Sequence, residues 1–145
     1  TYAIGRIEPD FFEKGRNGRF FRIPVYSNTK LALLLFTQEF AERLQDKDIT
    51  INASDPGIVS TNMITMQAWF DPLTDILFRP FIKTPAQGAA TAIHLALSDE
   101  AKDRNGCCYA NCKKRNVSER IRHHAQQKQL WDDTEILLRQ KGIRF

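Results

Sequence analysis

Tyr26 and Lys30 lie four residues apart in the segment Tyr26-Ser27-Asn28-Thr29-Lys30. On a helix, this spacing places two side chains on one face. An ammonium held beside a phenol stabilises the phenolate form, so the phenol can act as a general acid or base toward a substrate oxygen near neutral pH. Lys30 keeps further donors for a neighbouring ligand hydroxyl. The spacing therefore predicts an acid–base pair at the start of a helix.

A second motif, PGIVST at residues 56–61, begins twenty-six residues after Lys30 and ends a β-branched run. Pro56 ends the hydrogen bonding of a strand, and Gly57 lets another molecule approach the backbone closely. Ligands of a parallel α/β sheet bind beyond the carboxyl ends of its strands. The amides of this bend and the Thr61 hydroxyl are therefore predicted to bind a planar amide such as the carboxamide of nicotinamide. A plain strand-ending turn is the alternative.

The elements that must position these motifs alternate between helix and strand. Residues 27–45 have a helical pattern with a ladder of large apolar residues (Leu31, Leu35, Phe36, Phe40 and Leu44). Residues 49–53 form a short β-branched run. A helix followed after a tight connection by a short buried strand is the unit of a parallel α/β sheet.

Further elements are predicted after the second motif. Thr84 and Pro85 mark the start of a helix that runs to about residue 98. It is expected to bury four apolar side chains or their neighbours (Ala89, Ala92, Ile93 and Leu97). Residues 107–111 are predicted to be the last strand. Ser118 is predicted to cap a final helix to about residue 140, held by five apolar anchors (Ile121, Leu130, Trp131, Ile136 and Leu137).

Composition excludes several classes of protein. The 145 residues fit one domain or a large part of one, and 42% hydrophobic with 26% charged residues is typical of a globular protein. The longest apolar run, residues 31–36, is far shorter than the roughly 20 residues that span a bilayer. Residues 1–9 contain no signal-peptide core, so we expect a cytoplasmic protein. Three cysteines (Cys107, Cys108 and Cys112) lack metal-ligand spacing, so no metal site is predicted.

Residues 11–22 mix four phenylalanines with four basic residues. Basic charge interleaved with aromatic rings is also found in sites for single-stranded nucleic acid. A surface loop that packs its phenylalanines on a core has the same composition, so no nucleic-acid partner is predicted.

Together the motifs resemble the short-chain dehydrogenase/reductase family. The resemblance is carried by YSNTKLA at residues 26–32, LFTQE at 35–39 and PGIVST at 56–61. FIKTPAQGA at residues 81–89 and the pair Leu130-Trp131 are similar to its retinol dehydrogenase-like branch. The resemblance implies an α/β fold, the C-terminal part of a Rossmann-type doubly wound parallel sheet without its N-terminal half. Residues 1–145 would then be the C-terminal half of one catalytic domain, with an active-site helix, a nicotinamide-side loop, a substrate segment and a C-terminal helix.

The resemblance also implies a function. The implied function is that of an NAD(P)-dependent oxidoreductase, which interconverts a carbonyl and an alcohol by hydride transfer. Tyr26 would donate or accept the proton, and Lys30 would hold the nicotinamide ribose. Four residues would contact the nicotinamide end (Pro56, Gly57, Val59 and Thr61). The cofactor is NADP or NAD, with NADP slightly favoured by the resemblance. Because the family's glycine-rich phosphate loop is not among these residues, the chain alone is expected to be inactive.

Other interpretations of the same residues stay open. The apolar segment at residues 63–81 is expected to cover a small apolar carbonyl or alcohol substrate, or to pack on the domain or contact a membrane surface peripherally. The fold could also serve a non-catalytic dinucleotide-sensing or scaffold protein. Finally, the helix Tyr26–Gln45 is a candidate homodimer interface through Phe36 and Phe40.

Overall fold

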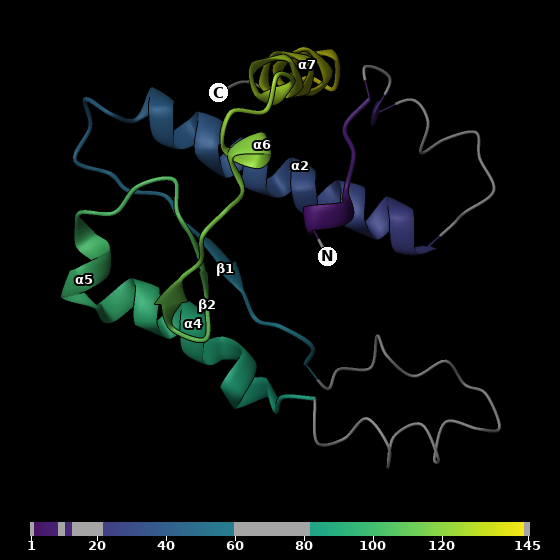
Figure 1. Ribbon diagram of the computed structural model, residues 1–145. Coiled ribbons are helices and arrows are strands. Elements are labelled where there is room, and N and C mark those ends of the chain that lie inside the picture. Colours follow the sequence, from purple (N-terminus) through teal and green to yellow (C-terminus); the bar gives the residue numbers. More distant parts are fainter. Residues whose placement is uncertain (1, 9–10, 13–21, 60–81, 144–145) are drawn as a thin grey trace, which may run out of the picture. The chain divides into compact units, whose positions relative to one another are not determined.

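A computed structural model describes residues 2–8, 11–12, 22–59 and 82–143, which fall into two compact units (Figure 1). The first unit comprises Thr1–Ala53, Asn105–Cys107 and Asn116–Phe145. The second unit comprises Ser54–Arg104 and Cys108–Arg115.

The first unit is built on the helix α2 (Arg22–Arg43), which confirms the predicted active-site helix. The helix begins at Arg22, earlier than the expected Ser27. Pro24 lies in its first turn, where backbone N–H groups have no partner within the helix, so proline costs no helical hydrogen bond there. Leu31 and Leu35 of the predicted apolar ladder are fully buried. The short helix η1 (Tyr2–Ile4) packs against α2.

The single C-terminal helix that the sequence predicts is two helices in the structure. α6 (Glu119–Arg122) and α7 (Gln127–Gln140) are separated by residues 123–126. Within this break the N–H of Gln126 donates to Nδ1 of His124 at 3.2 Å, a local side-chain bond in place of a helical one. Ser118 is the N-cap residue, but its side chain makes no capping hydrogen bond. Ile136, an expected anchor, is 54% exposed.

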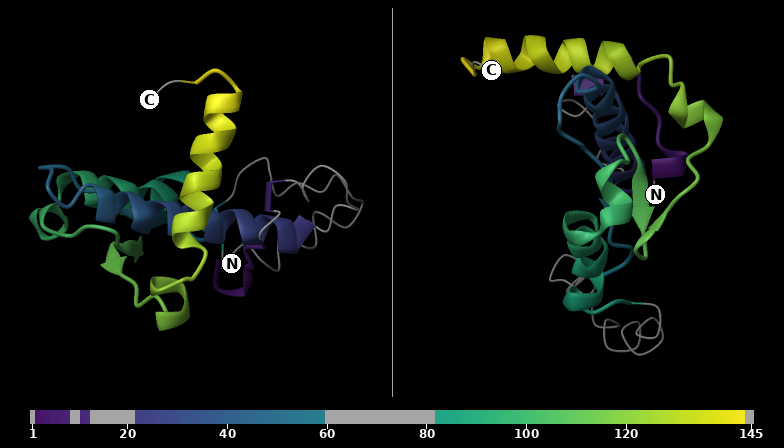
Figure 2. Two further views of the ribbon diagram at one scale, coloured as in Figure 1. Left: turned by 90° about the horizontal axis from the view of Figure 1, so that it is seen from above. Right: turned by 90° about the vertical axis from the view of Figure 1, so that its left-hand side faces the viewer.

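α7 crosses α2 and is held there by aromatic rings (Figure 2). The Trp131 ring stacks on Phe36 with centroids 4.8 Å apart and lies 5.4 Å from the ring of Phe40. The guanidinium of Arg43 sits 4.6 Å from the Trp131 ring, a cation–π contact. The aromatic residues that were expected to face a second protomer therefore contact the same chain.

A buried polar cluster adds to this helix–helix contact. The side-chain amide of Gln127 donates to Glu39 at 3.2 Å and to Glu42 at 3.1 Å. Glu39 also pairs with Arg43 at 2.9 Å. Because Glu39 is buried, these donors supply the hydrogen bonds that a buried carboxylate requires.

The histidine in the break between α6 and α7 gives a pH prediction. Burial, with a smaller contribution from Arg120, lowers the pKa of His124 below 6.5. The unfolded chain therefore binds this proton at a higher pH than the folded chain does, and the free energy of unfolding should fall as pH drops through 6.5. Urea unfolding between pH 7.5 and 5.5 measures this slope. His124→Gln should make the slope shallower, whereas the exposed His123→Gln should leave it unchanged.

The expected strand at residues 49–53 is wrong in position, because β1 is Ala53–Asp55. The preceding residues are instead held by asparagine side chains. The N–H of Ile51 donates to Oδ1 of Asn105, and the N–H of Cys107 donates to Oδ1 of Asn52, both at 2.9 Å. Ile49 is exposed. These side-chain bonds add to two backbone hydrogen bonds between the same segments, from the Gly106 N–H to the Ile51 carbonyl and from the Ala53 N–H to the Cys107 carbonyl, both at 2.8 Å.

In its described residues, the second unit contains a small sheet with strand order β1-β2-β3 together with helices, which confirms an α/β chain. The predicted last strand is β2 (Cys108–Ala110), and β3 (Lys113–Lys114) pairs with it antiparallel. Asn111 and Cys112 form the two-residue turn with φ values of 53° and 58°. Positive φ at both positions is typical of a type I′ hairpin. The sequence did not predict β3, because cysteine seldom occupies such a position.

The helix α4 (Pro85–Leu97) begins as predicted, and α5 (Asp99–Lys102) follows it. The N–H of Gln87 donates to the Thr84 hydroxyl at 3.2 Å, and the N–H of Thr84 donates to the Gln87 side chain at 2.9 Å. This reciprocal pair is a capping box. Pro85 occupies the first helical position.

The buried residues of α4 are neighbours of the four apolar residues that were named for its buried face. Gly88 and Thr91 are its buried residues. A β-carbon at Gly88 would lie 2.6 Å from a methyl of Val59, so the helix approaches its neighbours through its smallest side chains. The four apolar residues that were named for the buried face are exposed (Ala89, Ala92, Ile93 and Leu97). Among them, Leu97 is 78% exposed.

No helix in residues 2–8, 11–12, 22–59 or 82–143 has the length and apolar character of a membrane span. Within the same ranges, no three histidine, cysteine, aspartate or glutamate side chains gather as a metal site.

Candidate active site

Tyr26 and Lys30 lie together on the second and third turns of α2. The ammonium of Lys30 sits 5.2 Å from the centroid of the Tyr26 ring, a cation–π contact. Tyr26 is 46% exposed and Lys30 is also exposed. The sequence prediction that the two side chains share a face is confirmed, and both are accessible to a ligand.

The opposite side of this turn is packed against residues 2–8. Ser27 is fully buried, and a β-carbon at Gly5 would lie 2.5 Å from the Ser27 carbonyl oxygen. The N–H of Arg6 donates to Oδ1 of Asn28 at 2.8 Å. Because Ser27 and Asn28 face this segment, Tyr26 and Lys30 are turned toward solvent.

The bend that follows β1 belongs to the second unit. Gly57 has a φ of +77°, in the left-handed region that favours glycine. Its N–H donates to the Asp55 side chain at 2.9 Å, and the carbonyl of Ile58 accepts the N–H of Lys83 at 2.9 Å. Pro56, Gly57 and Ile58 are all exposed. The bend therefore presents its backbone at the carboxyl end of a strand.

Val59 and Thr61 were also predicted to contact the nicotinamide end, and the structure describes only the first of them. The side chain of Val59 packs against Gly88 of α4, and Val59 forms a parallel bridge with Lys83. Its side chain therefore has a structural contact, and its main chain is the part suited to a ligand. Thr61 lies outside the described residues, as does the expected substrate segment at residues 63–81.

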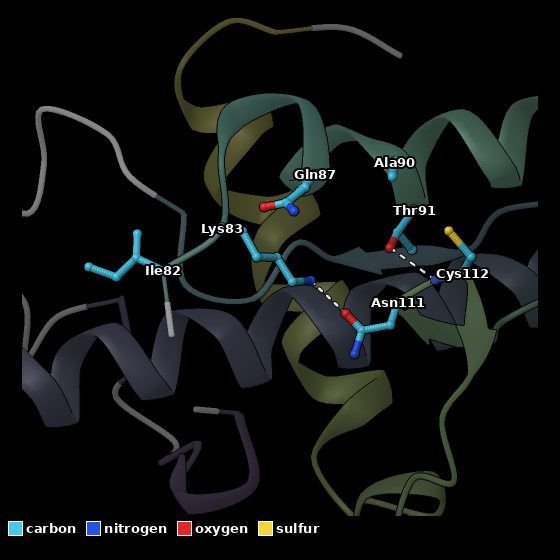
Figure 3. A pocket seen from close by; sticks show the side chains of 7 residues that line it. All are labelled: Ile82, Lys83, Gln87, Ala90, Thr91, Asn111 and Cys112. Atoms are coloured by element: carbon cyan, nitrogen blue, oxygen red, sulfur yellow. Dashed lines mark hydrogen bonds between the residues drawn. The ribbon is translucent and has the colours of Figure 1, made fainter. Parts of the chain in front are cut away.

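Two residues at this bend were missed by sequence reasoning. Lys83 Nζ donates to the carbonyl of Pro56 at 3.0 Å and to Oδ1 of Asn111 at 2.6 Å. Both partners are more than 25 residues away along the chain, so no local pattern signals the contact. Lys83 and Asn111 line a cavity of about 380 Å³ together with Thr91 and Cys112 (Figure 3).

Comparison with known proteins covers both motifs. A model described as short chain dehydrogenase matches residues 14–69, a range that contains all six predicted site residues. Retinol dehydrogenase 12 of Mus musculus is 36% identical over 145 residues, the whole of this chain and 44% of its own length. The chain belongs to the short-chain dehydrogenase family.

Within this family the chain is retinol dehydrogenase-like. Retinol dehydrogenase 14 of Homo sapiens is 36% identical over 116 residues, which are 78% of this chain and 34% of that protein. A WW domain-containing oxidoreductase of Drosophila melanogaster is 32% identical over 120 residues, 83% of this chain and 29% of its own length. The chain thus spans less than half the length of the curated relatives that it matches.

Short-chain dehydrogenases generally use NAD or NADP, and the residues described here fit the nicotinamide end of such a group. Tyr26 and Lys30 expose a phenol and an ammonium side by side. The surface at Gly57 is open only because glycine occupies it, since a β-carbon there would lie 3.3 Å from Lys83 Nζ. Each feature by itself provides polar atoms, the first suited to a ribose and the second to a carboxamide.

Proposed function

We propose that the complete protein carrying this sequence is an NAD(P)-dependent oxidoreductase that interconverts a carbonyl and an alcohol. This chain would be the C-terminal half of its catalytic domain, the last part of a Rossmann-type sheet, and inactive alone. NADP is the preferred cofactor on family resemblance. A cytoplasmic location and a peripheral membrane contact are parts of the same proposal.

One observation carries the proposal: the Lys30 ammonium lies beside the exposed Tyr26 ring, 5.2 Å from its centroid. An exposed phenol can exchange a proton with a substrate oxygen as a general acid or base. The pair is fixed from behind by the buried contact between Gly5 and Ser27. General acid–base chemistry requires such fixed geometry as well as the right groups.

The chain's own residues would manage the proton of the reaction. In reduction, the Tyr26 hydroxyl donates its proton to the carbonyl oxygen of the substrate while the carbonyl carbon receives a hydride. The nicotinamide, when bound, supplies that hydride chemistry. Lys30 stabilises the phenolate that is left and donates to the ribose hydroxyls. Pro56, Gly57, Val59 and Thr61 would hold the carboxamide end.

An apolar substrate is supported by two observations. Residues 63–81 are rich in large apolar side chains, and the relatives above carry retinol in their names. Burial of apolar surface on binding favours a substrate with a long hydrocarbon part over a small polar carbonyl. We therefore propose a small apolar carbonyl or alcohol as the substrate class.

The test uses the complete protein with NADPH or NADH and two apolar carbonyls, all-trans-retinal and decanal. Lys30→Ala should raise the dissociation constant of the dinucleotide about tenfold and lower turnover at least a hundredfold, because one cation serves both binding and proton transfer. Isothermal titration and absorbance at 340 nm measure the two effects. Lys47→Ala, which removes an exposed ammonium elsewhere in the first unit, is the matched control.

Two alternatives give different results in the same assays. A dinucleotide-sensing protein would bind NADPH or NADH without turning over either carbonyl. A dimerisation module would use an exposed face of α2. Leu33, at 58% exposure, is the large apolar residue available there, since Phe36 and Phe40 contact Trp131 within the chain. The mass of the complete protein by sedimentation would reveal such pairing.

A further inference from the structure

Lys83 joins three separate parts of the second unit. Its backbone N–H donates to the carbonyl of Ile58 at 2.9 Å. Its ammonium donates to the carbonyl of Pro56 at 3.0 Å and to Oδ1 of Asn111 at 2.6 Å. Figure 3 shows the Lys83 side chain directed at Asn111 on the turn after β2. One residue thus ties the bend after β1 to the turn after β2.

The stem of Lys83 also lies over Gly57. A β-carbon at Gly57 would lie 3.3 Å from Nζ and 3.4 Å from Cε of Lys83. On the other side, the Gly57 N–H donates to Asp55, whose second carboxylate oxygen lies 3.5 Å from Arg115. The left-handed glycine is therefore held between a lysine stem and an anchored carboxylate.

The Lys83 ammonium is not satisfied by a carboxylate. Among the described residues, its hydrogen-bond acceptors are two neutral oxygen atoms, and no aspartate or glutamate lies within ion-pair distance. A hydrogen bond from a charged donor to a neutral carbonyl is stronger than one between neutral groups. The Lys83 ammonium therefore restrains the carbonyl of Pro56, the first residue of the bend.

We propose that Lys83 is a positioning residue for the nicotinamide end of the cofactor. It acts by holding the bend at residues 56–59 in one conformation before the ligand arrives, which lowers the ordering cost of binding. Asn111 accepts a hydrogen bond from the Lys83 ammonium and thereby orients it. Asn111 itself lies in the hairpin turn, with a φ of 53°. This inference rests on the proposed function.

The test compares binding of the whole dinucleotide with binding of a fragment that lacks the nicotinamide end. Lys83→Met keeps the stem over Gly57 and removes the donors. In the complete protein it should weaken NADPH binding about tenfold and leave binding of 2′-phospho-ADP-ribose, which lacks nicotinamide, within twofold. Lys83→Arg should bind NADPH within threefold of wild type, because its guanidinium also carries several donors. Lys114→Met on β3 is the matched control for loss of one exposed charge.

Asn111→Gly provides a second variant that tolerates positive φ and removes the Oδ1 acceptor. It should weaken NADPH binding about threefold with the same selectivity over 2′-phospho-ADP-ribose. Unchanged NADPH affinity in Lys83→Met, or equal weakening of both ligands, would overturn the positioning role while leaving the proposed function intact. Failure of the wild-type protein to bind NADPH or NADH would instead overturn the proposed function and this inference with it.

Discussion

Tyr26→Phe is expected to lower turnover of an apolar carbonyl by a factor of roughly a thousand in the complete protein, since general acid–base groups contribute about 10²–10⁴ to rates. Phenylalanine keeps the ring against which the Lys30 ammonium lies 5.2 Å away. Only the hydroxyl is lost, so the dissociation constant of the dinucleotide should change by less than about threefold. Stopped-flow absorbance gives turnover, and isothermal titration gives binding.

The matched control is Tyr109→Phe, which removes the same atom from a buried ring on β2. Its turnover should stay within about threefold of wild type, because the ring is not accessible to a ligand. Tyr26→Phe with near-normal turnover would remove Tyr26 from the chemistry. The same low turnover in both variants would point to general damage to the fold.

Trp131→Ala is expected to destabilise the first unit by about 3 kcal/mol, at the lower end of the range for removal of a large aromatic side chain. The substitution removes the stack on Phe36, the contact with Phe40 and the cation–π contact of Arg43. The Trp131 N–H also donates to Glu135 at 2.8 Å within α7. Urea unfolding measures the loss as a lower midpoint at constant slope.

Two further variants test whether the aromatic contact accounts for the loss of stability in Trp131→Ala. Trp131→Phe keeps an aromatic ring on Phe36 and should cost about 1 kcal/mol. Ile136→Ala, in the same helix but 54% exposed, should cost less than about 0.5 kcal/mol. If Trp131→Ala were as mild as Ile136→Ala, the aromatic contact would not be what holds α7 on α2.

Predictions that rested on local chemistry agree with the structure. The capping box at Thr84 is set by residues three apart, and the shared face of Tyr26 and Lys30 follows from the repeat of one helix. Both depend on neighbours within a single turn. The β2 strand after Asn105-Gly106 was likewise found close to its expected place.

Predictions that depended on what an element packs against were less successful. The apolar face of α4 was expected to be buried, but the close approach of Gly88 to Val59 turns the opposite face inward. The helix that carries Phe36 and Phe40 was a candidate dimer interface, and its sequence did not indicate that both rings contact Trp131, over ninety residues later in the chain. Hydrophobic periodicity identifies an apolar face without specifying its partner.

The sequence by itself determined the family, the shared face of Tyr26 and Lys30 and the proline-glycine bend, because each is encoded by residue types at short, fixed spacing. Only the tertiary structure decided which side chains hold these motifs in place. Lys83 reaches Pro56 and Asn111 across 27 and 28 residues, and Gly5 meets Ser27 from a separate segment. Such contacts arise when the folded chain brings distant residues together, and no spacing along the sequence specifies that approach.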